Sequence, residues 1–350
     1  MSSTLRLTIA GFIGLFLHGV IVAAPGAFLP QWTETFGGTV DIGGYYTVFL
    51  ISSLAGLYLV SRYRQRHPLF AGAFAAIALG LVFAALSPHF LGIWLAAIPI
   101  GFGDGTLNLH CNSLVGELHA KRRILFLNWA NATFGFGALS APLLGVFLPW
   151  RIGLAVVAIL AVVSIALAWQ APAAANFSPG RDRMPWRKAS PFLLVIMLYA
   201  GLESAIGTWG GHYLRHLGWS DAWSGALLSL YWAGLTLGRL SLGGWVSQRP
   251  VNAIRYLLLG AAIVVGMTSA PIFAIFFALS AFFYGPTFAT VFGLLQERCG
   301  HVALGYLFYA SYIGKSSIPA LFNGIESPTY LPYGFGFLAL LLYLVSLKLP

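Results

Sequence analysis

The sequence contains few charged residues and few cysteines. Only 8% of its 350 residues are Asp, Glu, Lys or Arg, whereas soluble domains carry about 25%. Two cysteines are too few for a disulfide framework. The sequence also lacks a metal-binding cluster, a Walker phosphate loop and a dinucleotide fingerprint. These shortages exclude an ordinary soluble enzyme, and we expect no cofactor and no bound metal.

Apolar residues are abundant instead. They make up 59% of the chain, and the mean hydropathy is +0.82. A helix that crosses a bilayer needs about 20 residues, and apolar runs of that length recur along the whole chain. The expected spans are 6–30, 40–60, 68–87, 90–116, 124–148, 152–170, 190–213, 222–246, 255–270, 271–296, 303–323 and 332–348. The sequence therefore predicts an all-α polytopic membrane protein with twelve transmembrane helices in two six-helix bundles.

The longest polar stretch lies near the middle of the chain, at residues 171–189. It includes the basic residues from Arg181 to Lys188, and its composition is typical of a linker. We therefore expect an N-terminal six-helix bundle over 1–170 and a C-terminal one over 190–350. Repeated helical halves with a central site are typical of secondary transporters.

The basic residues predict the orientation of the chain. With both termini in the cytoplasm, all but four of the 19 Lys and Arg residues fall on the inner side, as the positive-inside rule requires. The exceptions are Arg151 and Arg215 outside, and Arg239 and Lys315 within helices. We expect a multi-pass monomer in the lipid bilayer of the inner (cytoplasmic) membrane. Its positive charge is spread over short loops, so we expect no nucleic-acid partner.

Short motifs resemble a known family. The residues from Gly238 to Arg249, and a reduced copy from Arg62 to Arg66, resemble the loop motif of the major facilitator superfamily. The stretches Gly201–Trp209, Gly101–Asn112 and Gly314–Pro319 are similar to the fucose-permease-like sugar:proton symporter group. The resemblance implies alternating access about a central site, with a sugar moved together with protons.

Ionisable side chains inside the apolar runs are the candidates for proton coupling. Placing a charge at the centre of a spanning helix costs about 2.5–3.5 kcal/mol on insertion scales. We expect Glu203, Asp104 and His18 to carry protons. The alternative for Asp104 and His18 is a hydrogen bond that ties helices together. The alternative for Glu203 is a permanent ion pair with Lys315, although we expect that pair to be switchable.

Polar side chains on the same runs are the candidates for substrate binding. Asp104, Asn108 and Asn112 are four residues apart and therefore share one helix face. The predicted substrate-binding residues are Asn108, Asn112, Asn128, Asn131, Trp209, Tyr284, Tyr312 and Lys315. Helix packing is the alternative for the asparagines, an interfacial position for Trp209 and snorkelling for Lys315. We also expect Tyr284-Gly-Pro286 to interrupt its helix.

These residues predict a secondary active transporter that moves a small polar solute, a sugar or related compound, together with protons. An organic-anion transporter is the chief alternative because Lys315 supplies positive charge. A drug:proton antiporter follows, on a loose match of Gly137–Gly145 to its signature. A remote alternative is an intramembrane aspartyl protease, which Gly101-Phe-Gly-Asp104 and Pro319-Ala-Leu321 resemble. That enzyme needs a second membrane aspartate, which the sequence lacks, so we expect no enzyme.

Overall fold

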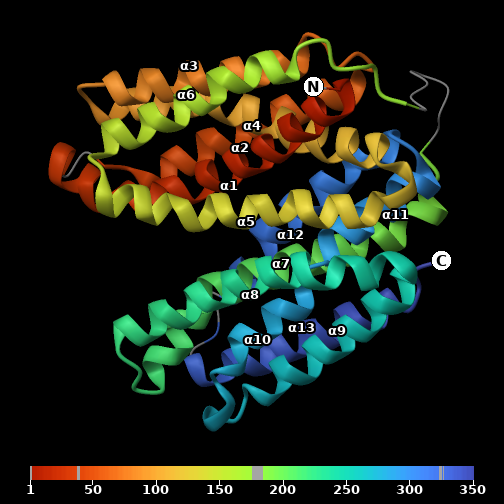
Figure 1. Ribbon diagram of the computed structural model, residues 1–350. Helices are drawn as coiled ribbons and strands as arrows, with labels where there is room; N and C mark the ends of the chain where they lie inside the picture. The colour runs from red at the N-terminus through yellow and green to blue at the C-terminus, as the bar shows by residue number, and fades with distance from the viewer. Residues whose placement is uncertain (1, 38–39, 176–183, 323–324, 326) are drawn as a thin grey trace. The chain divides into compact units, whose positions relative to one another are not determined.

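A computed structural model of the protein describes residues 2–37, 40–175, 184–322, 325 and 327–350. The regular structure in these ranges consists of α-helices and short 3-10 turns (Figure 1). The expected all-α fold is confirmed. Ten helical segments in the described ranges are long and apolar enough to cross a membrane.

The first six predicted spans each form one α-helix. Their bounds are α1 (Ser3–Phe36), α2 (Ile42–Arg62), α3 (Leu69–Leu86), α4 (Phe90–Leu118), α5 (Arg123–Phe147) and α6 (Trp150–Ala168). A 3-10 turn, Ala120–Arg122, links α4 to α5. The helix α1 is longer than predicted because the Ser2 hydroxyl caps its start, and Gly37, at a φ of 60°, ends it.

The remaining spans form seven helices, because one predicted span is divided. Their bounds are α7 (Trp186–His216), α8 (Asp221–Gln248), α9 (Pro250–Met267), α10 (Phe276–Tyr284), α11 (Thr287–Cys299), α12 (Val302–Leu321) and α13 (Leu331–Ser346). The predicted interruption is confirmed, since α10 ends at Tyr284 and α11 begins at Thr287. The start of that span, Pro271–Phe273, is a 3-10 turn rather than α-helix.

Contacts divide the chain into two compact units. Unit 1 comprises Met1–Ala120 and Thr133–Asp182, and unit 2 comprises Lys121–Ala132 and Arg183–Pro350. The first part of α5 therefore packs with the C-terminal helices. The predicted boundary at residue 170 assigns all of α5 to the N-terminal bundle, because it was drawn from the polarity of the sequence and not from helix contacts.

Glycines allow the helices of unit 1 to approach closely. In this unit α4 packs against α1, α2 and α3, and α3 also packs against α6 (Figure 1). A Cβ atom on Gly105 would collide with the carbonyl oxygen of Ser53, and one on Gly56 would collide with that of Phe102. These positions require glycine because backbone lies where a side chain would go. The helix α4 is thereby held firmly, with Asp104 beside one of these contacts.

The closest helix pair in unit 2 joins α7 to α12. These helices pack along much of their length, while α8 packs against α10 and α9 against α13. A Cβ atom on Gly314 would collide with the carbonyl oxygen of Met197. The contact brings the Ser204 hydroxyl of α7 to 3.2 Å from the Lys315 carbonyl oxygen of α12.

Candidate functional site

Four polar side chains from α1 and α4 form a continuous hydrogen-bonded chain inside unit 1. His18 Nδ1 lies 2.7 Å from Asp104 Oδ1. Its other ring nitrogen, Nε2, lies 3.3 Å from Asn108 Nδ2. Asn108 Oδ1 in turn accepts a hydrogen bond of 3.1 Å from Asn112 Nδ2. We call these four residues the unit 1 polar chain.

Helical spacing produces this arrangement. Asp104, Asn108 and Asn112 follow each other at four-residue steps, so α4 presents them on one face. His110 lies off that face, with its ring 5.6 Å from the ring of Phe70. Asp104 and Asn112 are fully buried, whereas His18 and Asn108 are partly exposed. Water can therefore reach the chain at His18 and Asn108.

The His18–Asp104 contact joins an imidazole to a buried carboxyl group. The Asp104 side chain is 1% exposed, and its second oxygen, Oδ2, has no hydrogen-bond partner. A buried carboxylate with an unsatisfied oxygen is costly unless a positive group compensates it. A protonated His18 supplies that charge at hydrogen-bond distance. The geometry therefore suits a proton-dependent change of bonding.

A second polar cluster lies inside unit 2, around Glu203. The Glu203 side chain is buried and interacts electrostatically with the buried hydroxyls of Tyr199 and Tyr231. Arg239, which is 4% exposed, interacts electrostatically with the same two hydroxyls. The Tyr199 hydroxyl faces both charged groups, but neither contact has the distance and alignment of a regular hydrogen bond. The Tyr284 hydroxyl is likewise buried without a hydrogen-bond partner.

The structure does not form the predicted Glu203–Lys315 pair. Glu203 is 7% exposed and turned into unit 2, whereas Lys315 is exposed. Arg239 is the basic residue that shares the Tyr199 and Tyr231 neighbourhood with Glu203. Its guanidinium donates to the carbonyl oxygens of Gly285 (3.1 Å) and Asn131 (3.0 Å). Arg239 was missed as a neighbour of Glu203, and its one signal in the sequence is a basic residue inside an apolar run.

The other predicted substrate-binding residues occupy different surroundings in unit 2. Asn128 is fully buried and donates to Ile124 O (2.9 Å) and Thr290 Oγ1 (3.4 Å). Asn131, 6% exposed, donates to Leu127 O. The Trp209 indole donates to Pro319 O at 3.0 Å, and Tyr312 is half-buried. Both asparagine amides serve helix contacts in this conformation, and their role in substrate binding stays a prediction.

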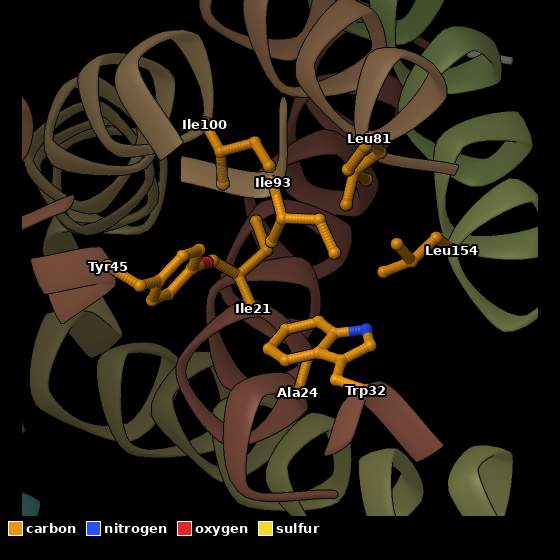
Figure 2. Close-up of a pocket in the computed structure, with 9 residues that line it drawn as sticks. Ile21, Ala24, Trp32, Tyr45, Leu81, Ile93, Ile100 and Leu154 are labelled. Carbon is orange, nitrogen blue, oxygen red and sulfur yellow. The ribbon is translucent and has the colours of Figure 1, made fainter. Parts of the chain in front are cut away.

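Two small cavities border described residues, and both are too small for a solute. One of about 20 Å³ in unit 1 is bordered by Trp32, Tyr45 and aliphatic side chains (Figure 2). Another in unit 2, beside Tyr231 and Phe277, measures about 10 Å³. Ligand pockets are usually about 300–1,000 Å³, and these cavities have room for one water molecule at most. A more open hollow in unit 1, bordered by Asp41, Phe90 and Trp94, measures about 360 Å³ and is large enough for a small solute.

Comparison with known proteins adds a family match. The model of the Major Facilitator Superfamily matches residues 11–319. Bypass of stop codon protein 6 of Saccharomyces cerevisiae is 23% identical over 385 residues, covering 95% of this chain and 76% of the yeast protein.

Solved structures of the same architecture are also similar. The E. coli fucose:proton symporter FucP has a TM-score of 0.80 and 14% identity, with full coverage of both chains. The human organic anion transporter MFSD10 (TETRAN) has a TM-score of 0.76 and 14% identity, covering 99% of this chain and 100% of its own. At such identities the likeness shows the fold alone.

Proposed function

Because the chain belongs to the Major Facilitator Superfamily and is a multi-pass secondary transporter, we propose that it moves a small polar solute together with protons. The solute class is a sugar or a related hydroxylated compound. The observation that carries the proposal is the unit 1 polar chain, in which a histidine–aspartate pair is bonded to two asparagine amides. Amides both donate and accept hydrogen bonds, so they suit hydroxyl groups.

The family match also decides the enzyme question. Members of this superfamily are transporters, not enzymes, so the intramembrane protease alternative is wrong. The local geometry agrees, because the partner of Asp104 is His18, whereas an aspartyl protease needs two carboxyl groups that share one proton.

Proton binding changes the hydrogen bonds of the unit 1 polar chain in a definite order. When His18 is neutral and carries its proton on Nδ1, that N–H donates to Asp104, and Nε2 accepts from Asn108 Nδ2. A proton that arrives at Nε2 turns this nitrogen into a donor. Two donors then face each other, so the Asn108 amide must rotate to present its Oδ1. That oxygen is the present acceptor for Asn112, and the rotation breaks their bond.

This exchange of partners links the proton to the solute. Asn108 is partly exposed, so its amide can contact a hydroxylated solute and His18 in turn. Protonation decides whether the amide presents a donor or an acceptor to the solute. A ligand that binds one arrangement better than the other shifts the equilibrium toward it, and proton and solute thereby favour or oppose each other.

We assign Glu203 a supporting part in the same cycle. Its buried carboxylate lies in a cluster with Tyr199 and Arg239, where the basic group compensates the charge. Glu203 exchanges protons through the neighbouring tyrosine hydroxyls, whereas His18 and Asp104 form the primary proton site.

Reconstituted vesicles test the proposal. Uptake across a panel of sugars and organic anions, with and without an inward pH gradient, identifies the solute and shows whether protons drive its accumulation. Asp104→Asn keeps an acceptor for His18 Nδ1 but removes the charge. We expect it to lose accumulation while retaining solute exchange at equal concentrations, because exchange needs no net proton movement.

The control is His216→Gln, which alters an exposed histidine at the end of α7, in unit 2 rather than in the unit of the polar chain. It should accumulate solute as the wild type does. Normal proton-driven accumulation by Asp104→Asn would contradict the proposed site. A wild type in which a pH gradient drives no solute would contradict proton coupling.

A further inference from the structure

One exposed helix face in unit 2 is polar, unlike the exposed faces of its neighbours. On α7, Ser204 is half-buried, and Thr208 and His212 are exposed at four-residue steps. Lys315 of α12 is exposed beside them, since the Ser204 hydroxyl donates to its carbonyl oxygen. We call these four residues the α7–α12 polar face.

Other helices expose large apolar side chains, as contact with lipid requires. The exposed residues of α9 include Tyr256, Leu259 and Ile263, and those of α13 include Phe337, Leu340 and Leu344. A charged group and a row of hydroxyls on a spanning helix are tolerated where they line a water-filled space. The α7–α12 polar face is therefore a wet surface on which a solute can bind.

The hydrogen bonds within this face determine what it can offer a ligand. The Ser204 hydroxyl proton is used on Lys315 O (3.2 Å), and the Thr208 hydroxyl proton is used on Ser204 O (2.8 Å). Each hydroxyl has one proton, so both oxygens remain as acceptors for a ligand. They lie one helical turn apart, about 6 Å along the axis. Such acceptors complement hydroxyl groups, which are donors.

The charge of the face is positive. The Lys315 ammonium offers three donors and a full charge, and the exposed His212 imidazole lies at the other end of the row. The acidic residue of this stretch, Glu203, is turned inward, so it does not neutralise the exposed face. A carboxylate accepts charge-assisted hydrogen bonds from an ammonium ion.

We infer that the transported solute is a hydroxylated carboxylate, of the class of sugar acids. Its carboxylate binds Lys315, and its hydroxyl groups donate to Ser204 and Thr208. The inference rests on the proposed transport function and narrows its substrate class. A neutral sugar satisfies only the hydroxyl acceptors, whereas a plain organic anion satisfies only Lys315.

The test compares matched ligands in proteoliposomes that contain the full chain. Initial uptake is measured for a neutral hexose, for the aldonate and uronate of the same stereochemistry, and for a carboxylate of equal length without hydroxyls. We expect the sugar acids to be preferred over the neutral hexose by at least about tenfold, as a charge-assisted hydrogen bond provides, and over the plain carboxylate by several-fold, as neutral hydrogen bonds provide. Lys315→Gln should remove the preference over the neutral hexose, and Lys315→Arg should retain most of it.

Ser204→Ala tests the contact with the hydroxyl groups of the ligand, and Lys348→Gln is the matched control for the loss of a lysine charge. Ser204→Ala should weaken uptake of the sugar acid several-fold but leave the plain carboxylate unchanged. Lys348→Gln, at the other end of unit 2 in sequence, should change nothing. Thermal unfolding in detergent shows whether each variant is folded, and Lys315→Arg keeps the test valid if the neutral variant is not.

The outcomes distinguish the two levels of the proposal. Transport of neutral sugar equal to that of its acid, unaffected by Lys315→Gln, overturns the inference while the proposed function stands. Preference for the plain carboxylate also overturns it, in favour of a general anion transporter. Absence of flux for every hydroxylated solute overturns both.

Discussion

A buried ion pair at one end of unit 1 leads to a quantitative prediction about stability. The guanidinium of Arg66 is fully buried and binds both oxygens of Glu117, at 2.8 and 2.9 Å. It also donates to Ser113 Oγ (3.1 Å) and to Pro172 O (3.4 Å). Glu117 accepts a further bond of 3.1 Å from the backbone of Ala175. The pair thereby ties residues that follow α6 to the ends of α2 and α4.

Glu117→Ala removes the partner of a buried cation. Breaking such a pair usually costs about 3–5 kcal/mol, because the remaining charge is stranded. The Glu117 side chain is 16% exposed, so water offsets part of the loss and we expect about 3 kcal/mol. Replacing both partners, as in Arg66→Met with Glu117→Leu, leaves no stranded charge and should cost clearly less than the sum of the single changes.

The control is a second glutamate–arginine pair, which lies in unit 2. Glu297 lies 3.6 Å from Arg123, but its side chain is 64% exposed. Exposed pairs contribute about 0–1 kcal/mol, so Glu297→Ala should barely change the free energy of unfolding.

Titration of unfolding with SDS in mixed micelles measures these differences. Limited proteolysis adds an independent readout, because loss of Glu117 releases Ala175 and should speed cleavage near that residue. Equal costs for Glu117→Ala and Glu297→Ala would refute the reasoning, since Glu117 is both more buried and more extensively hydrogen-bonded than Glu297. Additive costs in the double variant would show that the two charges are not coupled.

Three further predictions follow from other parts of the structure. Gly105→Ala places a Cβ against the Ser53 carbonyl and should destabilise unit 1 by about 1–3 kcal/mol. The control is Gly72→Ala, whose Cβ meets no atom within 4 Å, and it should be neutral or stabilising by up to about 1 kcal/mol. Unfolding titrations measure both changes in the free energy of unfolding. Glu203→Gln and Arg239→Gln should show a coupling energy of about 0.5–3 kcal/mol in a double-mutant cycle, while Glu203→Gln and Lys315→Gln should add within about 0.5 kcal/mol. Burial lowers the pKa of His119 from its ordinary value of 6.5, so the unfolded chain binds this proton more readily than the folded one. Stability should therefore fall as the pH drops below 6.5 toward the lowered pKa, and His119→Gln should reduce that dependence in thermal melts at several pH values.

The sequence alone determined the class of the protein and the positions of its helices. Apolar runs of spanning length leave little choice, because in lipid every backbone polar group must be satisfied within the segment. The four-residue spacing of Asp104, Asn108 and Asn112 determined that they share one helix face, because an α-helix repeats about every 3.6 residues. The break after Tyr284 was also readable, since Gly285 and Pro286 weaken the helix there.

Only the tertiary structure decided which polar groups meet. The bond between His18 and Asp104 joins residues 86 positions apart. Sequence spacing does not predict which residue of α1 lies beside which residue of α4. Glu203 has two basic residues inside spans of its own half, Arg239 and Lys315, and the sequence offers no way to choose between them. The choice depends on the rotation of α7, α8 and α12 about their own axes. That rotation is set by close contacts such as Gly314 on Met197, which turn Glu203 inward and leave Lys315 exposed.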